Sequence, residues 1–126
     1  MVEGNARQTI ANEIVKLQSE YYGRGPTRAK AYISGDLVAI VLEETFTPAE
    51  KTLIERGEAE GVRDIRRRFQ QAMRDQFVSI VEQATGRRVR SFISDTDLEQ
   101  DLSVELFILA EDRTDMSAFE PEDPEG

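Results

Sequence analysis

The side chains able to do chemistry in this 126-residue sequence are carboxylates and arginines, because the chain contains no cysteine and no histidine. Zinc sites built on those two residue types, thiol nucleophiles and Ser-His-Asp triads therefore lack their usual groups. An enzyme that uses only carboxylates and arginines ranks third among the functional hypotheses. We expect no enzymatic activity, no catalytic residue, no metal and no cofactor.

One candidate set is an acidic cluster at residues 95–101, made of Asp95, Asp97, Glu99 and Asp101. Its spacing does not match an EF-hand loop, because the sixth position is not glycine and Leu106 stands where the twelfth-position glutamate would be. Paired carboxylates for acid–base catalysis would need a partner that the sequence does not show. The pattern favours a solvated turn in which one aspartate caps backbone amides.

A second candidate is a short glycine-rich segment at residues 23–28 that contains two arginines. Such a loop can hold an anion on its backbone amides, here those of Gly25, with Arg24 and Arg28 adding positive charge. It is not a P-loop, because it follows a helical pattern and lacks the Gly-Lys-Ser/Thr ending. The alternative, which the pattern favours, is a helix stop that leads into a strand.

Further arginines lie on the polar side of a long helical pattern and just past its end. They are Arg63, Arg66, Arg67, Arg68 and Arg74, followed by Arg87, Arg88 and Arg90. Arg63 and Arg67 are candidates for binding a partner. If the fold brings Arg24 and Arg28 near Arg87 and Arg88, the four form one basic patch for a phosphate-bearing ligand, an anionic membrane surface or an acidic segment of a partner. The favoured alternative is pairing within the helix, with Glu58, Glu60, Asp64 and Asp75.

The elements that would position these side chains form a helix–strand–strand unit that occurs twice. Residues 31–37 read A-Y-I-S-G-D-L and residues 91–98 read S-F-I-S-D-T-D-L, and each copy follows a helical pattern that ends in a Gly-Arg pair. We expect the two copies to pack around a pseudo-twofold axis.

Apolar spacing and turn residues give the boundaries of these elements. The spacing of Ile10, Ile14 and Leu17 predicts a helix that ends at Gly23. Strands at 29–34 and 37–44 join at a Gly35-Asp36 hairpin turn, and Thr47, Pro48 and Glu50 start a capped helix. A long apolar stripe at 62–84 predicts the next helix. Strands at 89–94 and 102–110 follow, joined by the acidic loop 95–101.

This element order predicts an α+β fold. Two helix–β-hairpin units, in the order αββ-α-αββ, form a four-stranded, mainly antiparallel sheet with helices on one face. Residues 1–110 are expected to form a single domain, and the acidic tail at 111–126 to be mostly disordered. Apolar residues alternate on both faces of the sheet, so we expect a homo-oligomer, with a dimer as the simplest form.

The charge balance limits the class of partner. The net charge is −9, and residues 111–126 hold seven acids against one arginine, so the remaining residues carry only about −3. A mildly acidic body argues against nucleic-acid binding. No stretch approaches the roughly 20 apolar residues of a membrane span, and the N-terminus lacks a signal peptide's apolar region. We therefore expect a cytoplasmic protein with no direct membrane span.

Four segments of the chain resemble a family of small uncharacterised bacterial and archaeal domains. They are the helix end Tyr22-Gly23-Arg24-Gly25-Pro26, the capped start Phe46-Thr47-Pro48-Ala49-Glu50 with Leu53, the helix with Val62, Arg63, Arg67 and Phe69, and Ala84-Thr85-Gly86-Arg87-Arg88-Val89. The family is the MpsC-like family, named after a Na+-translocating membrane-potential-generating system that is also linked to inorganic-carbon uptake. The resemblance covers roughly residues 6–110.

The resemblance implies a soluble accessory subunit beside membrane components, and it supplies no established catalytic residues. The first hypothesis is accordingly a non-enzymatic accessory or regulatory module that binds a partner protein, for example a membrane transport subunit. The second is a sensor of a small anionic ligand, held by the Gly25 amides and nearby arginines.

Overall fold

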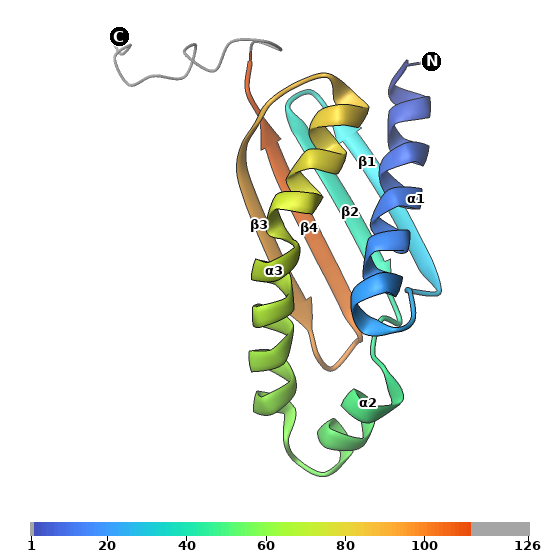
Figure 1. The fold of residues 1–126 in the computed structure, drawn as a ribbon, viewed down its shortest axis with the longest axis vertical. Helices are drawn as coiled ribbons and strands as arrows, with labels where there is room; N and C mark the ends of the chain where they lie inside the picture. Colours follow the sequence, from blue (N-terminus) through green and yellow to red (C-terminus); the bar gives the residue numbers. More distant parts are fainter. Residues whose placement is uncertain (1, 112–126) are drawn as a thin grey trace, which may run out of the picture.

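The computed structural model describes residues 2–111, which form three helices and four strands (Figure 1). In chain order these are α1 (Val2–Tyr22), β1 (Arg28–Ser34), β2 (Leu37–Glu43), α2 (Pro48–Glu55), α3 (Ala59–Thr85), β3 (Val89–Asp97) and β4 (Leu102–Leu109). The expected α+β class is confirmed. Most of the expected acidic tail, from residue 112 on, lies outside the described residues.

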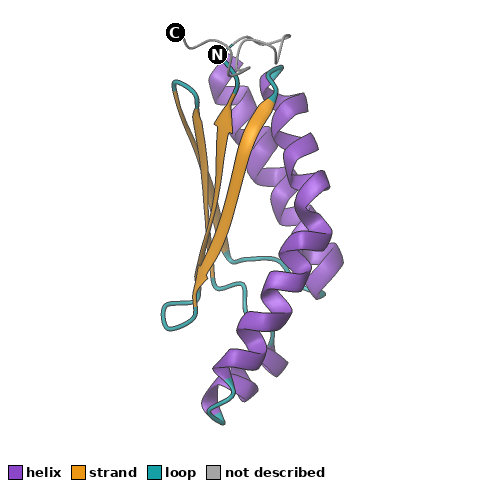
Figure 2. Ribbon diagram, turned by 90° about the vertical axis from the view of Figure 1, so that its left-hand side faces the viewer, coloured by secondary structure: helices purple, strands orange, loops and turns teal. Residues whose placement is uncertain are grey.

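The molecule has two layers, a sheet and a pair of long helices (Figure 2). Helices α1 and α3 run antiparallel across the same face of the sheet, and the short α2 lies beyond one end of it (Figure 1). The other face of the sheet carries no helix in the described part of the chain. Because both long helices pack on one face of the sheet, the strand side chains on the other face remain uncovered in the described part of the chain.

The strand order in the sheet is β1-β2-β4-β3, and all neighbouring strands are antiparallel. The two hairpins therefore meet in the middle, where β2 pairs with β4 in the register Ala39↔Leu106. Each hairpin follows a helix that ends at a glycine with positive φ, Gly23 at 84° and Gly86 at 73°. The pseudo-twofold arrangement of the two units stays a prediction.

Alternation along the strands separates the two faces. Val38, Ile40 and Leu42 of β2 are fully buried under the helices, together with Phe107 and Leu109 of β4. From the helices, the core receives Ile10, Ile14 and Leu17 of α1 and Met73, Phe77 and Val81 of α3. Successive spacings of three or four residues place each helical set on one side of its helix, as the sequence pattern predicts.

The start of α2 follows the local rules of helix capping. The Thr47 hydroxyl accepts the Glu50 amide at 3.2 Å, and the Glu50 carboxylate accepts the Thr47 amide at 2.8 Å. Pro48 occupies the first turn, where a missing N–H costs nothing. The predicted capping box is present, and it places the Glu50 side chain at the beginning of the helix.

The acidic loop expected at 95–101 is shorter than predicted. Strand β3 continues to Asp97, so that Asp95 and Asp97 are strand residues and only residues 98–101 make the turn. The Asp97 carboxylate accepts the amides of Glu99 and Gln100, which is the capping role expected for one aspartate. The prediction ended the strand too early because exposed edge positions tolerate polar residues on alternate sides.

Candidate functional site

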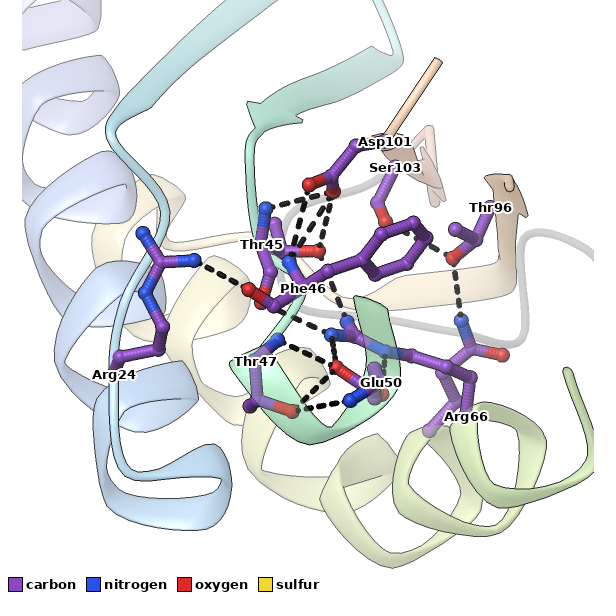
Figure 3. A network of polar contacts seen from close by, with 10 residues as sticks. Arg24, Thr45, Phe46, Thr47, Glu50, Arg66, Thr96, Asp101 and Ser103 are labelled. Carbon is purple, nitrogen blue, oxygen red and sulfur yellow. Dashed lines mark hydrogen bonds and ion pairs between the residues drawn. The ribbon is translucent and has the colours of Figure 1, made fainter. Parts of the chain in front are cut away.

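A buried ion pair lies at the end of the sheet where α1 finishes and α2 begins (Figure 3). Arg66 of α3 is only 3% exposed. Its Nη2 donates to Glu50 Oε1 at 2.6 Å and its Nε donates to Glu50 Oε2 at 2.7 Å. This bidentate geometry is the strongest that an arginine and a carboxylate can form, and it joins α2 to α3.

The Arg66 guanidinium also contacts Thr45 and two aromatic rings. Nη1 donates to the Thr45 hydroxyl at 3.1 Å, and Nη2 donates to the Thr45 carbonyl at 3.0 Å. The guanidinium carbon lies 4.1 Å from the ring centre of Tyr22 and 5.1 Å from that of Phe46. Cation–π attraction thus supplements the hydrogen bonds of a buried charge.

Two further residues, Asp101 and Arg24, form hydrogen bonds with the segment between β2 and α2. The Asp101 carboxylate accepts the amide of Thr45 at 2.8 Å and that of Phe46 at 3.3 Å. Asp101 has a φ of 51°, in the left-handed region that aspartate tolerates better than most residues. Arg24, just past α1, donates to the Phe46 carbonyl. The network therefore connects α1, α2, α3 and the start of β4.

The electrostatics of the network follow from burial and the Arg66 charge. Burial opposes ionisation of Glu50, but the hydrogen bonds from Arg66 and from the Thr47 amide outweigh it and hold the pKa of Glu50 below its usual value. Burial raises the pKa of the Tyr22 phenol to about 12, although Arg66 acts in the opposite direction. At neutral pH the network thus holds Arg66 positive, Glu50 negative and Tyr22 neutral.

A second buried acid, Glu105, lies on the inner face of β4. It is 1% exposed, its Oε1 has no hydrogen-bond partner, and the Ser94 hydroxyl opposite it on β3 also has none. Burial raises the pKa of Glu105 to about 8, and the Ser94 side chain and the Arg66 charge offset this only in part. Glu105 is therefore mainly protonated at neutral pH.

An open groove lies between α3 and the edge strand β3. Its volume is about 410 Å³, and it is lined by Arg67, Gln70, Gln71, Arg74, Phe92 and Ser94. The Arg74 guanidinium lies 5.2 Å from the ring centre of Phe92. All the polar lining side chains can donate hydrogen bonds, so the groove is suited to an anion.

The structure does not bring the four candidate arginines together. Arg24 and Arg28 lie where β1 begins, next to the network, whereas Arg87 contacts Asp36 in the turn where β1 has ended. The strand β1 therefore separates the two pairs along its full length. The single basic patch expected from the sequence is not formed, because α1 and α3 are antiparallel and end at opposite ends of the sheet (Figure 1).

Each of these candidate residues has a local environment of its own. A Cβ atom on Gly25 would lie 2.6 Å from the Ser19 hydroxyl, so this glycine allows the chain to pass close to α1. Arg87 donates to Asp36, Gly35 and Ala110 and joins the first hairpin turn to the end of β4. Arg28 and Arg88 are exposed. Arg63 and Arg67 line hollows beside β3.

Sequence reasoning missed the burial of Arg66 and Glu105. Arg66 was assigned to the polar face of α3 and to pairing within the helix, whereas its partner Glu50 is on α2. In β4, alternation places residue 105 on the same face as Phe107 and Leu109, so the strand pattern contains a signal for the buried carboxyl of Glu105.

The outer face of the sheet is a third candidate surface. Its centre carries apolar side chains from β2 and β4, and the two edge strands add Tyr32 and Ile93. Tyr32 is 48% exposed and Ile93 57%. The apolar members of this outer-face patch are Tyr32, Leu37, Ala39, Val41, Ile93, Leu102, Val104, Leu106 and Ile108.

Together the fold and the site define a small α+β domain with a buried arginine network at one end of its sheet and an uncovered apolar face. A family model described as "Na+-translocating membrane potential-generating system (MpsC)" matches residues 3–111, which is most of the chain. The protein belongs to the MpsC family, as the resemblance predicted. No curated protein and no solved structure matches the chain. Among the described helices, none is long and apolar enough to cross a membrane.

Residues from three of the segments that carry the family resemblance meet in the Arg66 network. Tyr22 and Arg24 come from the end of α1, Phe46 and Glu50 from the capped start of α2, and Arg66 lies within the α3 segment between Val62 and Phe69. The recognisable motifs of this chain therefore describe one contact site at the junction of three helices. Among the described residues, no group of three or more acids is placed to hold a metal ion.

We predict that Arg66→Met lowers the free energy of unfolding by about 3 kcal/mol, because it leaves the buried Glu50 carboxylate unpaired. Arg67→Met, at the exposed neighbouring position, should change it by less than about 0.5 kcal/mol. Urea unfolding followed by circular dichroism measures both. Adding Glu50→Gln to Arg66→Met should recover part of the loss. Equal effects of Arg66→Met and Arg67→Met would contradict the assigned role of the network.

We also predict a pH dependence of stability that is due to Glu105. Its folded pKa of about 8 lies above the unfolded value of 4.5, so the native state binds the extra proton between these pH values and stability falls as the pH rises. The fall should be on the order of 3 kcal/mol between pH 5.5 and 8.5.

Between about pH 5.5 and 8.5 the change in stability can be assigned to Glu105. The chain has no histidine, and Glu50 is ionised in both the folded and the unfolded state at these pH values. Glu105→Gln mimics the protonated acid and should remove most of the slope, as urea unfolding at the two pH values measures. Every other group is the same in the two proteins, so the difference between their slopes is due to Glu105. A slope that survives Glu105→Gln unchanged would contradict the assignment.

Proposed function

We propose that the protein is a non-enzymatic accessory module whose outer-face patch is a protein-binding surface. The observation that carries this proposal is the one-sided cover of the sheet, with both long helices on the inner face (Figure 2). Nine apolar residues remain on the outer face of the described sheet, and they are contiguous because β2 and β4 are neighbours in the middle. Contiguous apolar surface of this kind is typical of interaction sites.

The composition of the patch supports a protein partner. Its centre is aliphatic, with Ala39 opposite Leu106 and Val41 opposite Val104. Charged residues stand at one end of the face, on the two edge strands and at Glu43 of β2. An apolar centre with a polar rim is the arrangement found in protein–protein interfaces. The family description names a Na+-translocating membrane-potential-generating system. We therefore propose that the module acts in the cytoplasm beside the membrane components of such a system.

This function predicts that a photo-crosslinking residue at Ala39, in the centre of the outer face, captures protein partners in the native cells. The same residue at Glu13, which is exposed on α1, is the matched control and should capture few or none. Leu106→Lys places a charge beside position 39 and should lower the Ala39 adducts roughly fourfold or more. Mass spectrometry identifies the adducts, and a membrane-fraction protein among them supports the proposed location. Equal capture from both positions would count against the proposal.

A second candidate function, the sensing of a small anion, is favoured by the groove between α3 and β3. Its donors come from Arg67, Arg74 and two glutamines. These differ from the residues expected from the sequence, since Arg24 and Arg87 bind backbone carbonyls at opposite ends of the sheet. The protonated Glu105 behind Ser94 adds no negative charge at neutral pH.

If the groove binds anions, inorganic phosphate should raise the melting temperature, because a ligand that binds only the folded state stabilises it. The shift should disappear in Arg67→Gln/Arg74→Gln. It should persist in the control Arg28→Gln/Arg88→Gln, whose arginines are exposed and away from the groove. Differential scanning fluorimetry measures the shift. The absence of any shift in the unmodified protein, or its loss only in the control, would refute the groove as the site.

A further inference from the structure

We propose that the occupant of the outer-face patch is a second copy of this chain, packed sheet on sheet about a twofold axis parallel to the strands. This inference rests on the proposed function, because it takes the outer face to be an interface. The charged residues at the edges of that face determine which partner is complementary to it and which twofold axis relates the two copies.

The register of the sheet arranges the outer face in rows that cross all four strands. One row holds Lys30, Val41, Val104 and Asp95, and the next holds Tyr32, Ala39, Leu106 and Ile93. A row on one side holds Arg28, Glu43, Leu102 and Asp97, and a row on the other side holds Ser34, Leu37, Ile108 and Ser91. The middle of every row except the one that contains Glu43 is therefore apolar.

The two edges of this face carry opposite charges at the same height. Arg28 and Lys30 stand on the edge strand β1, and Asp95 and Asp97 stand on the edge strand β3, in the same two rows. All four residues are exposed. Two intervening strands separate the basic edge from the acidic edge, a distance of about 14 Å, so they do not pair within one copy.

A rotation of 180° about an axis parallel to the strands exchanges the edges and keeps the rows. It places β1 over β3 of the second copy, so that Lys30 faces Asp95 and Arg28 faces Asp97 of the second copy. It also places Ala39 over the second copy's Leu106. Aligned sheets cross at about 30°, which moves edge residues by roughly 4 Å, within the reach of lysine and arginine side chains.

The alternative twofold axis, perpendicular to the strands, gives no such pairing. It places β1 over β1 and reverses the order of the rows, so that Lys30 faces Tyr32 and Asp95 faces Ile93 of the second copy. Asp95 would lose water without gaining a partner, and Lys30 would gain only a tyrosine ring such as the one that already lies 5.4 Å away in its own copy. The observed edge charges therefore favour the parallel axis, and they favour a second copy, because each charged edge is complementary to the other edge of the same face.

The size of the face sets the expected affinity. Four strands spaced about 4.8 Å apart and seven residues long give a face of about 19 Å by 24 Å. This lies at or below the roughly 800 Å² per partner of a standard interface once side-chain relief is included. We therefore expect a reversible dimer with a dissociation constant on the order of micromolar.

The test is sedimentation velocity on the purified full chain and on two charge reversals, Lys30→Glu and Asp95→Lys. Each reversal alone sets two like-charged pairs across the interface and should weaken self-association roughly tenfold. An equimolar mixture of the two variants should recover the dimer. In the mixed pair each introduced glutamate faces an introduced lysine, and each retained Lys30 faces a retained Asp95.

The mixture also serves as the folding control, because a variant that had failed to fold could not restore association. A monomeric unmodified chain at about 100 μM would overturn the proposal. So would a dimer that the reversals leave unchanged, or a mixture no better than either variant alone. A monomer that nevertheless gives Ala39 adducts with a different protein in cells would overturn the second copy as occupant and leave the proposed function standing. A monomer without any such adduct would remove both.

Discussion

The structure depends on the burial of one positive charge, the guanidinium of Arg66. A buried charge is tolerated only when it is paired, and Arg66 is held by groups from three other segments of the chain. Glu50 comes from α2, Thr45 from the connection after β2, and Tyr22 from the end of α1. If α2 or the connection after β2 moved away from Arg66, a charge or a donor would be left unpaired. The network therefore fixes where α1 ends and where α2 begins.

The same charge balance explains the state of Glu105. Glu50 pairs with Arg66 through two hydrogen bonds, and the Arg66 charge offsets the effect of burial on Glu105 only in part. Glu105 consequently holds its proton at neutral pH, as its raised pKa of about 8 indicates. The interior of this acidic protein thus carries no net charge from these three groups, and the repulsive acids are left to the surface.

Contacts between residues close in sequence made the elements of this fold predictable. The candidate site, in contrast, is formed by contacts between residues distant in sequence. The Gly35-Asp36 turn and the Thr47–Glu50 capping box are contacts between residues close in sequence, so the sequence alone reveals them. Arg66 and Glu50 are 16 positions apart and lie on different helices, and a helix pattern contains no information about that contact. The placement of Arg24 and Arg87 depends on the antiparallel packing of α1 and α3, which similar local motifs do not specify.

The uncovered sheet face follows from the number of elements and not from any one residue. Two long helices cover one side of a four-stranded sheet, and the short α2 is used to close the Arg66 network beyond the end of the sheet. No described element is left to cover the opposite side, yet alternation in β2 and β4 keeps that side aliphatic. A strand meant for solvent would carry polar residues at Val41, Val104 and Leu106. The aliphatic outer face and the opposite charges of its two edges are therefore the features on which the proposed protein contact rests.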